Sequence, residues 1–344
     1  MLAALATTGN PSSVHAAGRA ARRLMEDARE TLAARFGGAA RDLVFTSGGT
    51  EADALAIHAL GTGRRVIVGA TEHDAVRAAA PQALALPVDR NGVADLGVLE
   101  TWLTAGPPAL VCLMLANNET GTIQPVAEAA ALCRRFGAFM HVDAVQGAGR
   151  IGIDLAALGA HSIAVSSHKL GGPPGAGALL LAPEVSAISP LIAGGGQERG
   201  RRGGTPPLPA IAGLAAAAAV SPLELAPLRD AAEAAATAAG AIVCAAGAPR
   251  LPNTTSLALP GVRSDAQVIA LDLAGIAVSA GAACSSGKVS ASHVLEAMGL
   301  GPLAGQAIRV SLPWNTTEAD IGAFATAYAH MADRLRAALV QRAA

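Results

Sequence analysis

The sequence predicts an α/β fold built around a largely parallel sheet that helices cover on both faces. Short apolar runs alternate with longer segments whose apolar residues recur at helical spacing, which is the pattern of successive β–α–β units. Hydrophobic residues make up 52% of the 344 residues and charged residues 15%, so the chain can bury a large core and is neither disordered nor fibrous. A chain of this length is expected to form about two domains.

The first part of the chain contains most of the expected strands. Ser12 and Ser13 precede the first helical pattern, which runs to Arg35, and they are placed as helix N-caps would be. A glycine-containing loop at residues 47–50 leads into a helix that begins near Glu51, and a further helix is expected at residues 126–136. The expected strands occupy residues 43–46, 66–68, 110–115, 139–142, 163–165 and 178–181. Near-continuous apolar runs of this kind are typical of strands buried on both faces of a parallel sheet.

The pattern changes near Pro206, where two alanine-rich helical stretches begin. Beyond them, short strands are expected at residues 242–243, 256–259, 277–279 and 308–311, and helices at residues 265–273 and from Thr317 onward. This mixed pattern predicts a smaller α/β domain. We therefore expect a large domain over residues 1–222 and a C-terminal small domain over residues 223–344.

Composition and charge exclude several classes of partner. The net charge of −1 predicts no basic surface for nucleic acid or anionic lipid, and two Trp, one Tyr and five Phe are too few for base stacking. The charge-free run at residues 203–223 contains four prolines and is a poor membrane-spanning helix. The first residues lack the basic region and the long apolar stretch of a signal peptide. We expect a cytoplasmic protein that binds neither nucleic acid nor membrane.

The four cysteines are widely scattered and form no CxxC pair, so neither a disulfide framework nor a zinc site is expected. Cys112, Cys133 and Cys244 are expected to be small buried hydrophobic residues.

Lysine is scarce in this chain, and one lysine ends an expected strand. Of 25 basic residues only Lys169 and Lys288 are lysines. Arginine stays protonated and cannot act as an amine nucleophile, so both lysines are candidates for a Schiff base. Asp143 ends the preceding expected strand, and ligands of open α/β sheets bind outside the carboxyl ends of the strands. The loop at residues 47–50 opens a helix whose N–H groups can hold a phosphate. A phosphate site, a strand-end carboxylate and a lysine together suit pyridoxal 5′-phosphate (PLP).

Nine segments of the chain resemble, in order, the motifs of one enzyme family. They are residues 9–19, 45–51, 71–73, 117–121, 141–146, 166–169, 194–205, 279–287 and 308–311. The family is the class V aminotransferases, and within it the chain is similar to the NifS/IscS-type cysteine desulfurases. This resemblance implies a PLP-dependent homodimer of fold type I, with a mainly parallel seven-stranded sheet in the large domain and a smaller α/β C-terminal domain.

The resemblance implies a role for each residue at a matching position. Lys169 would form the Schiff base with the cofactor, and Asp143 would pair with its pyridine nitrogen. Gln146 would contact the phenolate oxygen of the cofactor. His73 would stack on the ring and shuttle protons.

Further residues are implied for the phosphate and the substrate. The implied phosphate ligands within one chain are Gly49, Thr50, Ser166 and His168. Thr205 resembles a phosphate ligand that the other subunit donates, so each site would need the homodimer. Asn118 matches a residue beside the cofactor and substrate, and Arg309 would bind the substrate carboxylate through its planar fork.

Cys284 lies in a stretch rich in Gly, Ala and Ser, where a thiol is expected to be accessible and mobile. By resemblance, Cys284 attacks the sulfur of L-cysteine and becomes a persulfide, while the rest of the substrate becomes L-alanine. The sulfur would then pass to an acceptor protein such as an iron–sulfur scaffold. No resident metal is expected, and the only metal role considered is that of Cys284 as a transient iron–sulfur ligand.

Alternatives stay open at this level. A selenocysteine lyase or a small-amino-acid aminotransferase would share the fold, although an aminotransferase needs no thiol such as Cys284. Relatives usually begin further upstream, so an inactive homologue with a truncated N-terminus is a further alternative. The presence of Lys169, Asp143, His73 and Cys284 argues against it. The sequence does not identify the sulfur acceptor.

Overall fold

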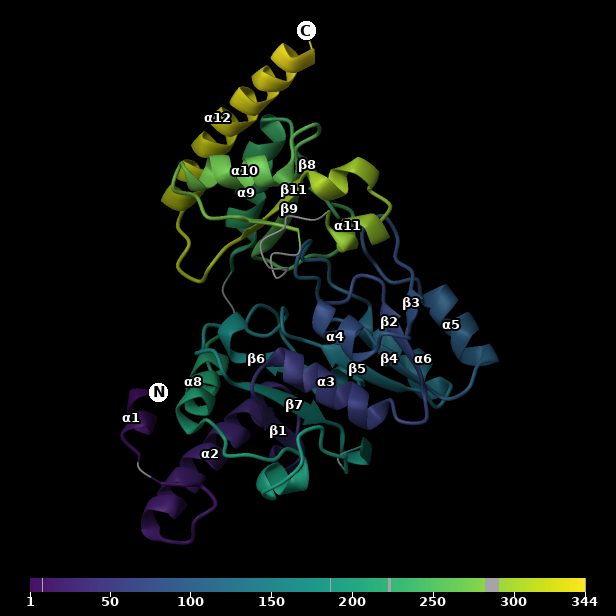
Figure 1. Cartoon of the computed structure of the whole chain (residues 1–344), viewed down its shortest axis with the longest axis vertical. Helices are drawn as coiled ribbons and strands as arrows, with labels where there is room; N and C mark the ends of the chain where they lie inside the picture. The colour runs from purple at the N-terminus through teal and green to yellow at the C-terminus, as the bar shows by residue number, and fades with distance from the viewer. Residues whose placement is uncertain (8, 186, 222–223, 282–290, 344) are drawn as a thin grey trace. The chain divides into compact units, whose positions relative to one another are not determined.

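The computed structural model of the chain describes residues 1–7, 9–185, 187–221, 224–281 and 291–343 (Figure 1). The chain divides into two compact units. The large unit comprises Met1–Leu86, Asp95–Leu115 and Gln124–Pro222, and the small unit comprises Pro87–Ala94, Ala116–Ile123 and Leu223–Ala344.

A seven-stranded sheet forms the centre of the large unit. Its strands are, in spatial order, β1 (Leu43–Thr46), β7 (Gly177–Leu181), β6 (Ser162–Ser166), β5 (Phe139–Asp143), β4 (Ala109–Cys112), β2 (Arg65–Gly69) and β3 (Leu84–Leu86). Strand β7 runs antiparallel to β1 and β6, whereas β6, β5, β4, β2 and β3 pair in parallel. The predicted α/β fold with a mainly parallel seven-stranded sheet is therefore confirmed.

Helices bury the strands of this sheet. Helix α3 (Gly49–Leu60) lies across β5, β6 and β7 beside α4 (Asp74–Ala79) (Figure 1). Helix α6 (Val126–Arg135) packs on β5, next to α5 (Leu96–Ala105) and α7 (Leu155–Leu158). Helix α2 (Ala16–Arg35) packs against α8 (Leu208–Ala218), which also contacts the short α1 (Leu2–Leu5). Strands β1, β4, β6 and β7 are buried along their whole length, as expected for strands covered on both faces.

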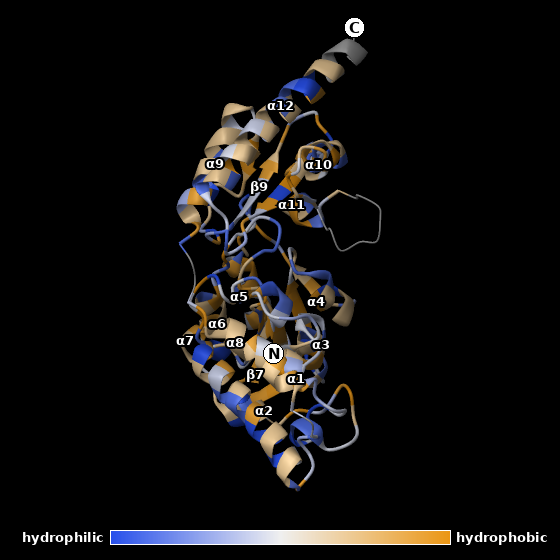
Figure 2. Cartoon of the chain, turned by 90° about the vertical axis from the view of Figure 1, so that its left-hand side faces the viewer, coloured by the Kyte–Doolittle hydropathy of each residue, from blue (hydrophilic) through white to orange (hydrophobic). Residues whose placement is uncertain are grey.

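The small unit is built on a four-stranded antiparallel sheet. Its strands are, in spatial order, β10 (Ser279–Ala280), β11 (Ala307–Ser311), β9 (Thr254–Ala258) and β8 (Ile242–Cys244). Helices α9 (Ala226–Ala238), α10 (Ser264–Asp272) and α12 (Glu318–Ala343) share one core with this sheet, and α11 (His293–Ala297) contributes to a second one. In Figure 2 strand β7 is hydrophobic, whereas the alanine-rich helix α9 is intermediate in hydropathy.

The small unit also takes in two segments that precede residue 223. The N–H of Ile123 donates to the carbonyl of Pro249 (2.8 Å), and the N–H of Leu251 donates to the carbonyl of Gly121 (2.8 Å). These backbone bonds explain why Ala116–Ile123 belongs to the small unit. A single boundary at residue 223 does not account for this segment or for Pro87–Ala94.

The ends of some elements differ from those expected. The N-cap of α2 is His15, whose Nδ1 accepts the N–H of Gly18 (3.2 Å), so Ser12 and Ser13 are not its caps. Strand β4 ends at Cys112, yet the N–H groups of Leu113 and Leu115 still donate to carbonyls of β5 and its end, His141 and Asp143. Among the residues that the structure describes, no helix combines the length and the apolar character needed to cross a membrane.

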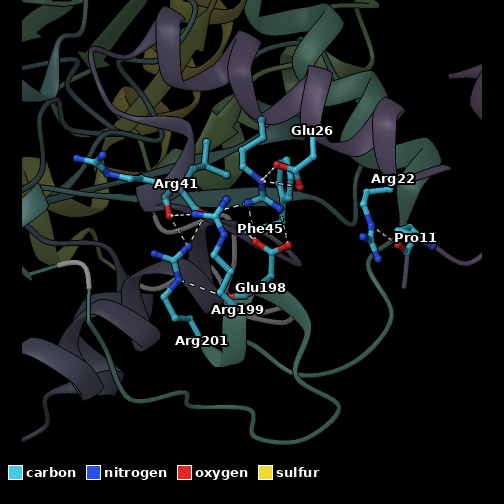
Figure 3. A network of polar contacts seen from close by, with 10 residues as sticks. Pro11, Arg22, Glu26, Arg41, Phe45, Glu198, Arg199 and Arg201 are labelled. Carbon is cyan, nitrogen blue, oxygen red and sulfur yellow. Dashed lines mark hydrogen bonds and ion pairs between the residues drawn. The ribbon is translucent and has the colours of Figure 1, made fainter. Parts of the chain in front are cut away.

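A buried ion pair holds the loop after β7 against α2 and β1 (Figure 3). Arg29 donates from Nη1 and Nη2 to the two carboxylate oxygens of Glu198, both at 2.8 Å, and Glu198 also accepts the N–H of Phe45 (2.8 Å). Glu198 and Arg199 have left-handed backbone angles, with φ of 49° and 59°. Such angles cost about 1–3 kcal/mol per residue for residues other than glycine. The paired carboxylate holds the loop in this conformation.

We predict that Glu198→Ala will destabilise the chain by about 3–5 kcal/mol, because Nη1 and Nη2 of the buried Arg29 lose their carboxylate and only Nε keeps an acidic partner, Glu26. The free energy of unfolding, measured with urea, checks this. Arg77→Ala is the control, because Arg77 pairs with Asp74 on the surface and its loss should cost about 0–1 kcal/mol. A loss in Glu198→Ala no larger than in the control would show that Glu26 or water compensates Arg29 for the missing carboxylate.

Candidate active site

The start of α3 lies close to the end of β6 and the beginning of β7, and no side chain among the described residues caps its first N–H groups. Gly48 is the N-cap residue and makes no side-chain cap, while the carboxylate of Glu51 accepts the N–H of Ser47 (2.8 Å). A Cβ on Gly49 would lie 2.7 Å from Cγ2 of Val145 and 3.5 Å from Cβ of Ser166. Thr50 is exposed in the first turn. An uncapped helix start carries a partial positive charge and is suited to a phosphate.

Lys169 lies directly after β6, in the short 3-10 helix Ser167–Lys169. Its side chain is half-buried, and its carbonyl accepts a hydrogen bond from Arg150 Nη2 (3.0 Å). His168 is exposed, and its Nδ1 lies 3.1 Å from Oγ of the buried Ser166. Partial burial and the neighbouring Lys169 lower the pKa of His168. This strand end thus brings an amine, an imidazole and a hydroxyl together.

Asp143 ends the adjacent strand β5 and is buried. Its Oδ1 accepts the N–H of Val145 (2.9 Å), which fixes the carboxyl group at the strand end. The pKa of Asp143 is raised to about 7, mainly by burial and also by the nearby Asp53, while the Val145 N–H, His73 and His141 act in the opposite direction. A cation beside this group would favour its ionised form.

Polar residues for which the motifs indicate no role lie behind Asp143. Oδ1 of Asp53, on α3, lies 3.1 Å from Nε2 of His141, whose Nδ1 lies 2.8 Å from Oγ of Ser162. Burial raises the pKa of Asp53 to about 8 and lowers the pKa of His141 to about 4. Glu72 is also buried, and its carboxyl group accepts the N–H of Met114.

His73 and Gln146 occupy the loops around the same strand ends. His73 is the N-cap of α4, and its Nδ1 accepts the N–H of Ala75 (3.1 Å), so the neutral ring carries its proton on Nε2. The carbonyl of Gln146 accepts a hydrogen bond from Arg150 Nη1 (2.6 Å). Because Arg150 also bonds Lys169, it joins the loops after β5 and β6. Nothing in the motifs marks this arginine.

Thr205 is exposed and follows the loop that Glu198 holds. In the same loop, Arg202 donates from Nε (2.7 Å) and Nη2 (3.2 Å) to the carboxylate of Glu51 in the first turn of α3. This ion pair attaches the loop to the helix start. It lowers the pKa of Glu51 against the effect of burial, so the carboxylate stays ionised.

Arg309 and Asn118 belong to the small unit, where they contact each other. Nη1 of Arg309 donates to the carbonyl of Asn118 (3.0 Å) and Nη2 to Oγ of Ser279 (3.1 Å). Both side chains are half-buried. Cys284, the expected nucleophile, lies outside the described residues.

We predict that Asp53→Asn will change how stability depends on pH. The folded chain keeps the Asp53 proton up to about pH 8, whereas the unfolded chain releases it near 3.8. Between these values the folded state binds more protons, so Asp53 makes stability fall as pH rises. Removing this titration should make the slope of the unfolding free energy against pH less negative by about 1.4 kcal/mol per pH unit between about pH 5 and 7.

Urea unfolding at several pH values measures this slope. Leu55→Ala on the same helix is the control, because it should lower stability at every pH without changing the slope. An unchanged slope in Asp53→Asn would mean that Asp53 is already ionised in the folded chain.

Comparisons with known proteins identify the family of the chain. The aminotransferase class-V family model matches residues 4–324. The cysteine desulfurase of Cereibacter sphaeroides is 42% identical, over 96% of this chain and 90% of that protein. The X-ray structure of a NifS-like protein from Rickettsia africae has a TM-score of 0.90 at 33% identity, over 96% of this chain and 94% of that one. The structure of SspA in complex with cysteine has a TM-score of 0.80 at 28% identity, over 91% and 94% respectively. The chain therefore belongs to the aminotransferase class-V family, and within it to the NifS/IscS-type cysteine desulfurases.

Proposed function

We propose that this chain is a PLP-dependent cysteine desulfurase that converts L-cysteine to L-alanine and takes up the sulfur as a persulfide on Cys284. The observation that carries the proposal is the arrangement of Gly49, Asp143 and Lys169 in the large unit. An uncapped helix start, a buried carboxyl group and a half-buried amine lie at the ends of neighbouring elements there. The cysteine desulfurase relatives support the reaction, and none of the relatives compared favours the lyase or aminotransferase alternative.

The residues present fit PLP. The backbone at Gly49 leaves a cradle that a single Cβ would close, since that atom would lie 2.7 Å from Val145. A phosphate in this cradle would accept the N–H groups of Gly49 and Thr50 and bonds from Ser166 and His168. A protonated ring nitrogen would pair with Asp143 and offset the energetic cost of burying its ionised form.

The chemistry that bound PLP supplies is an electrophilic carbon for the substrate amine and a ring that stabilises negative charge at the substrate α-carbon. Lys169 provides the amine that holds the cofactor and the base that removes the α-proton. Gln146 is proposed to bind the phenolate oxygen. His73 would stack on the ring of bound PLP, and its Nε2–H is available for proton transfer because Nδ1 accepts the N–H of Ala75.

Substrate and sulfur are handled by the remaining residues. Arg309 binds the substrate carboxylate through its fork, beside Asn118. The thiolate of Cys284 attacks the substrate Sγ, so a sulfur–sulfur bond forms and the Cβ–Sγ bond breaks. The electron pair of the broken bond stays with Cβ, which takes up a proton and gives alanine. The reaction thus converts L-cysteine and a thiol into L-alanine and a persulfide without an added oxidant.

The proposal includes partners. Exposed Thr205 is proposed to serve the phosphate of a second copy, which makes the working form a homodimer. The persulfide sulfur passes to an acceptor protein, and an iron–sulfur scaffold is our first candidate. A cytoplasmic location is part of the same proposal.

Lys169→Ala should lose covalent attachment of the cofactor and at least about 100-fold in alanine formation. Borohydride reduction of the PLP-loaded wild type, followed by peptide mass spectrometry, should find the label on residue 169. The matched control is Lys288→Ala, which should keep that label. A label on Lys288 in the wild type would contradict the assignment.

Cys284→Ser should still bind PLP and L-cysteine but lose persulfide and alanine formation, because a hydroxyl is a poor nucleophile toward sulfur. Alanine and sulfide produced from L-cysteine are the quantities to measure. Cys244→Ala, at a buried cysteine of the small unit, should retain activity. Release of sulfur by Cys284→Ser at the wild-type rate would require another nucleophile.

A further inference from the structure

Three buried polar residues link α3 to two strands of the large sheet. Asp53 is 1% exposed, His141 1% and Ser162 0%. The distances are 3.1 Å from Asp53 Oδ1 to His141 Nε2 and 2.8 Å from His141 Nδ1 to Ser162 Oγ. His141 and Ser162 are also register partners in the parallel pair β5–β6. We call Asp53, His141 and Ser162 the buried array.

Each member of the buried array shares an element with the proposed cofactor site. Asp53 lies on the helix whose start is Gly49. His141 precedes Asp143 by two residues on β5, so both side chains lie on the same face of the sheet. Ser162 begins the strand that ends at Ser166. A displacement of the array would therefore move the phosphate cradle relative to the carboxyl group.

Few of the buried groups around Asp53 and Asp143 can be ionised at the same time. Titratable groups that interact with Asp53 or Asp143 include Glu72 and His73 after β2, Cys112 on β4 and His141 on β5. Burial is the main cause that raises the pKa of Glu72 and of Cys112 and lowers that of His141. Ionised carboxyl groups in one buried region repel each other, so the cluster favours a single charge. Asp143, which has the N–H of Val145 and lies near His73, is the group that ionises first.

We propose that Asp53, His141 and Ser162 are positioning residues of the active site, which as a neutral hydrogen-bonded array hold the start of α3 against β5 and β6 and leave the negative charge on Asp143. This inference rests on the proposed function. In the array, the O–H of Asp53 donates to Nε2 of His141, and Nδ1–H of His141 donates to Oγ of Ser162. An asparagine at position 53 could donate in the same way, whereas a leucine could not.

The test compares Asp53→Asn, Asp53→Leu and Leu55→Ala with the wild type. Each unloaded protein is titrated with PLP to obtain its affinity, and the visible absorption of the loaded protein is followed against pH. Asp53→Asn should bind PLP within about twofold of the wild type and keep the pH midpoint. Asp53→Leu should bind about tenfold more weakly, since it leaves a buried imidazole nitrogen unpaired.

The pH midpoint of the visible absorption should also move upward in Asp53→Leu. A displaced Asp143 would hold the proton on the PLP ring nitrogen less firmly, and a ring with less positive charge repels the proton on the Lys169 nitrogen less strongly. Leu55→Ala controls for a general weakening of α3: it should unfold at lower urea concentration but keep the midpoint. If Asp53→Leu does not fold, Ser162→Ala, which removes the far end of the array, should show a smaller change of the same sign.

Several outcomes would overturn the inference. The first is that Asp53→Leu keeps the PLP affinity and the pH midpoint of the wild type, which would show that the buried array positions nothing. Ser162→Ala is judged by the same result if Asp53→Leu does not fold. Equal losses in Asp53→Asn and Asp53→Leu would show that an ionised Asp53 is required. A wild-type protein that binds no PLP would overturn the proposed function itself, and this result is distinct from both of the others.

Discussion

The structure depends on one close approach of backbone, between the start of α3 and the strands β6 and β7. A Cβ on Gly177 would lie 2.6 Å from the carbonyl carbon of Gly48, and one on Gly49 would lie 2.7 Å from Val145. Glycine removes these atoms, so the helix start reaches the strand ends. The N–H groups of the first turn then lie beside Ser166, on the strand that leads to Lys169. Without this approach, the uncapped start of α3 would not lie beside the end of β6.

Within each unit, arginine side chains attach the ends of helices to neighbouring elements. Carbonyls at helix C-termini lack partners within the helix, and the arginine fork can donate to them from outside. Arg35 bonds the carbonyl of Ala218 at the end of α8, Arg65 that of Trp102 in α5, and Arg336 those of Ala239 and Gly240 after α9. The excess of arginine over lysine therefore has a structural use.

Burial assigns different roles to chemically similar groups. Asp53 and Asp143 are both buried aspartates close to His141, but Asp143 accepts a backbone N–H at an open strand end, whereas Asp53 contacts an imidazole inside the core. The first is suited to hold a charge opposite a cation, and the second to carry a proton. Two other carboxylates are instead paired with arginine: Glu198, in the loop after β7, accepts from Arg29, and Glu51, in the first turn of α3, accepts from Arg202.

The sequence by itself determined the α/β class, most strand positions and the polar residues Asp143 and Lys169 at strand ends. Local runs of apolar residues followed by polar ones are enough to predict these features. Only the tertiary structure showed that Ala116–Ile123 joins the small unit, through backbone bonds to residues near Pro249. It alone brought Asp53 to His141, 88 positions away in the chain. No local pattern encodes such a contact, because a buried carboxyl group keeps its proton only when distant segments exclude water around it.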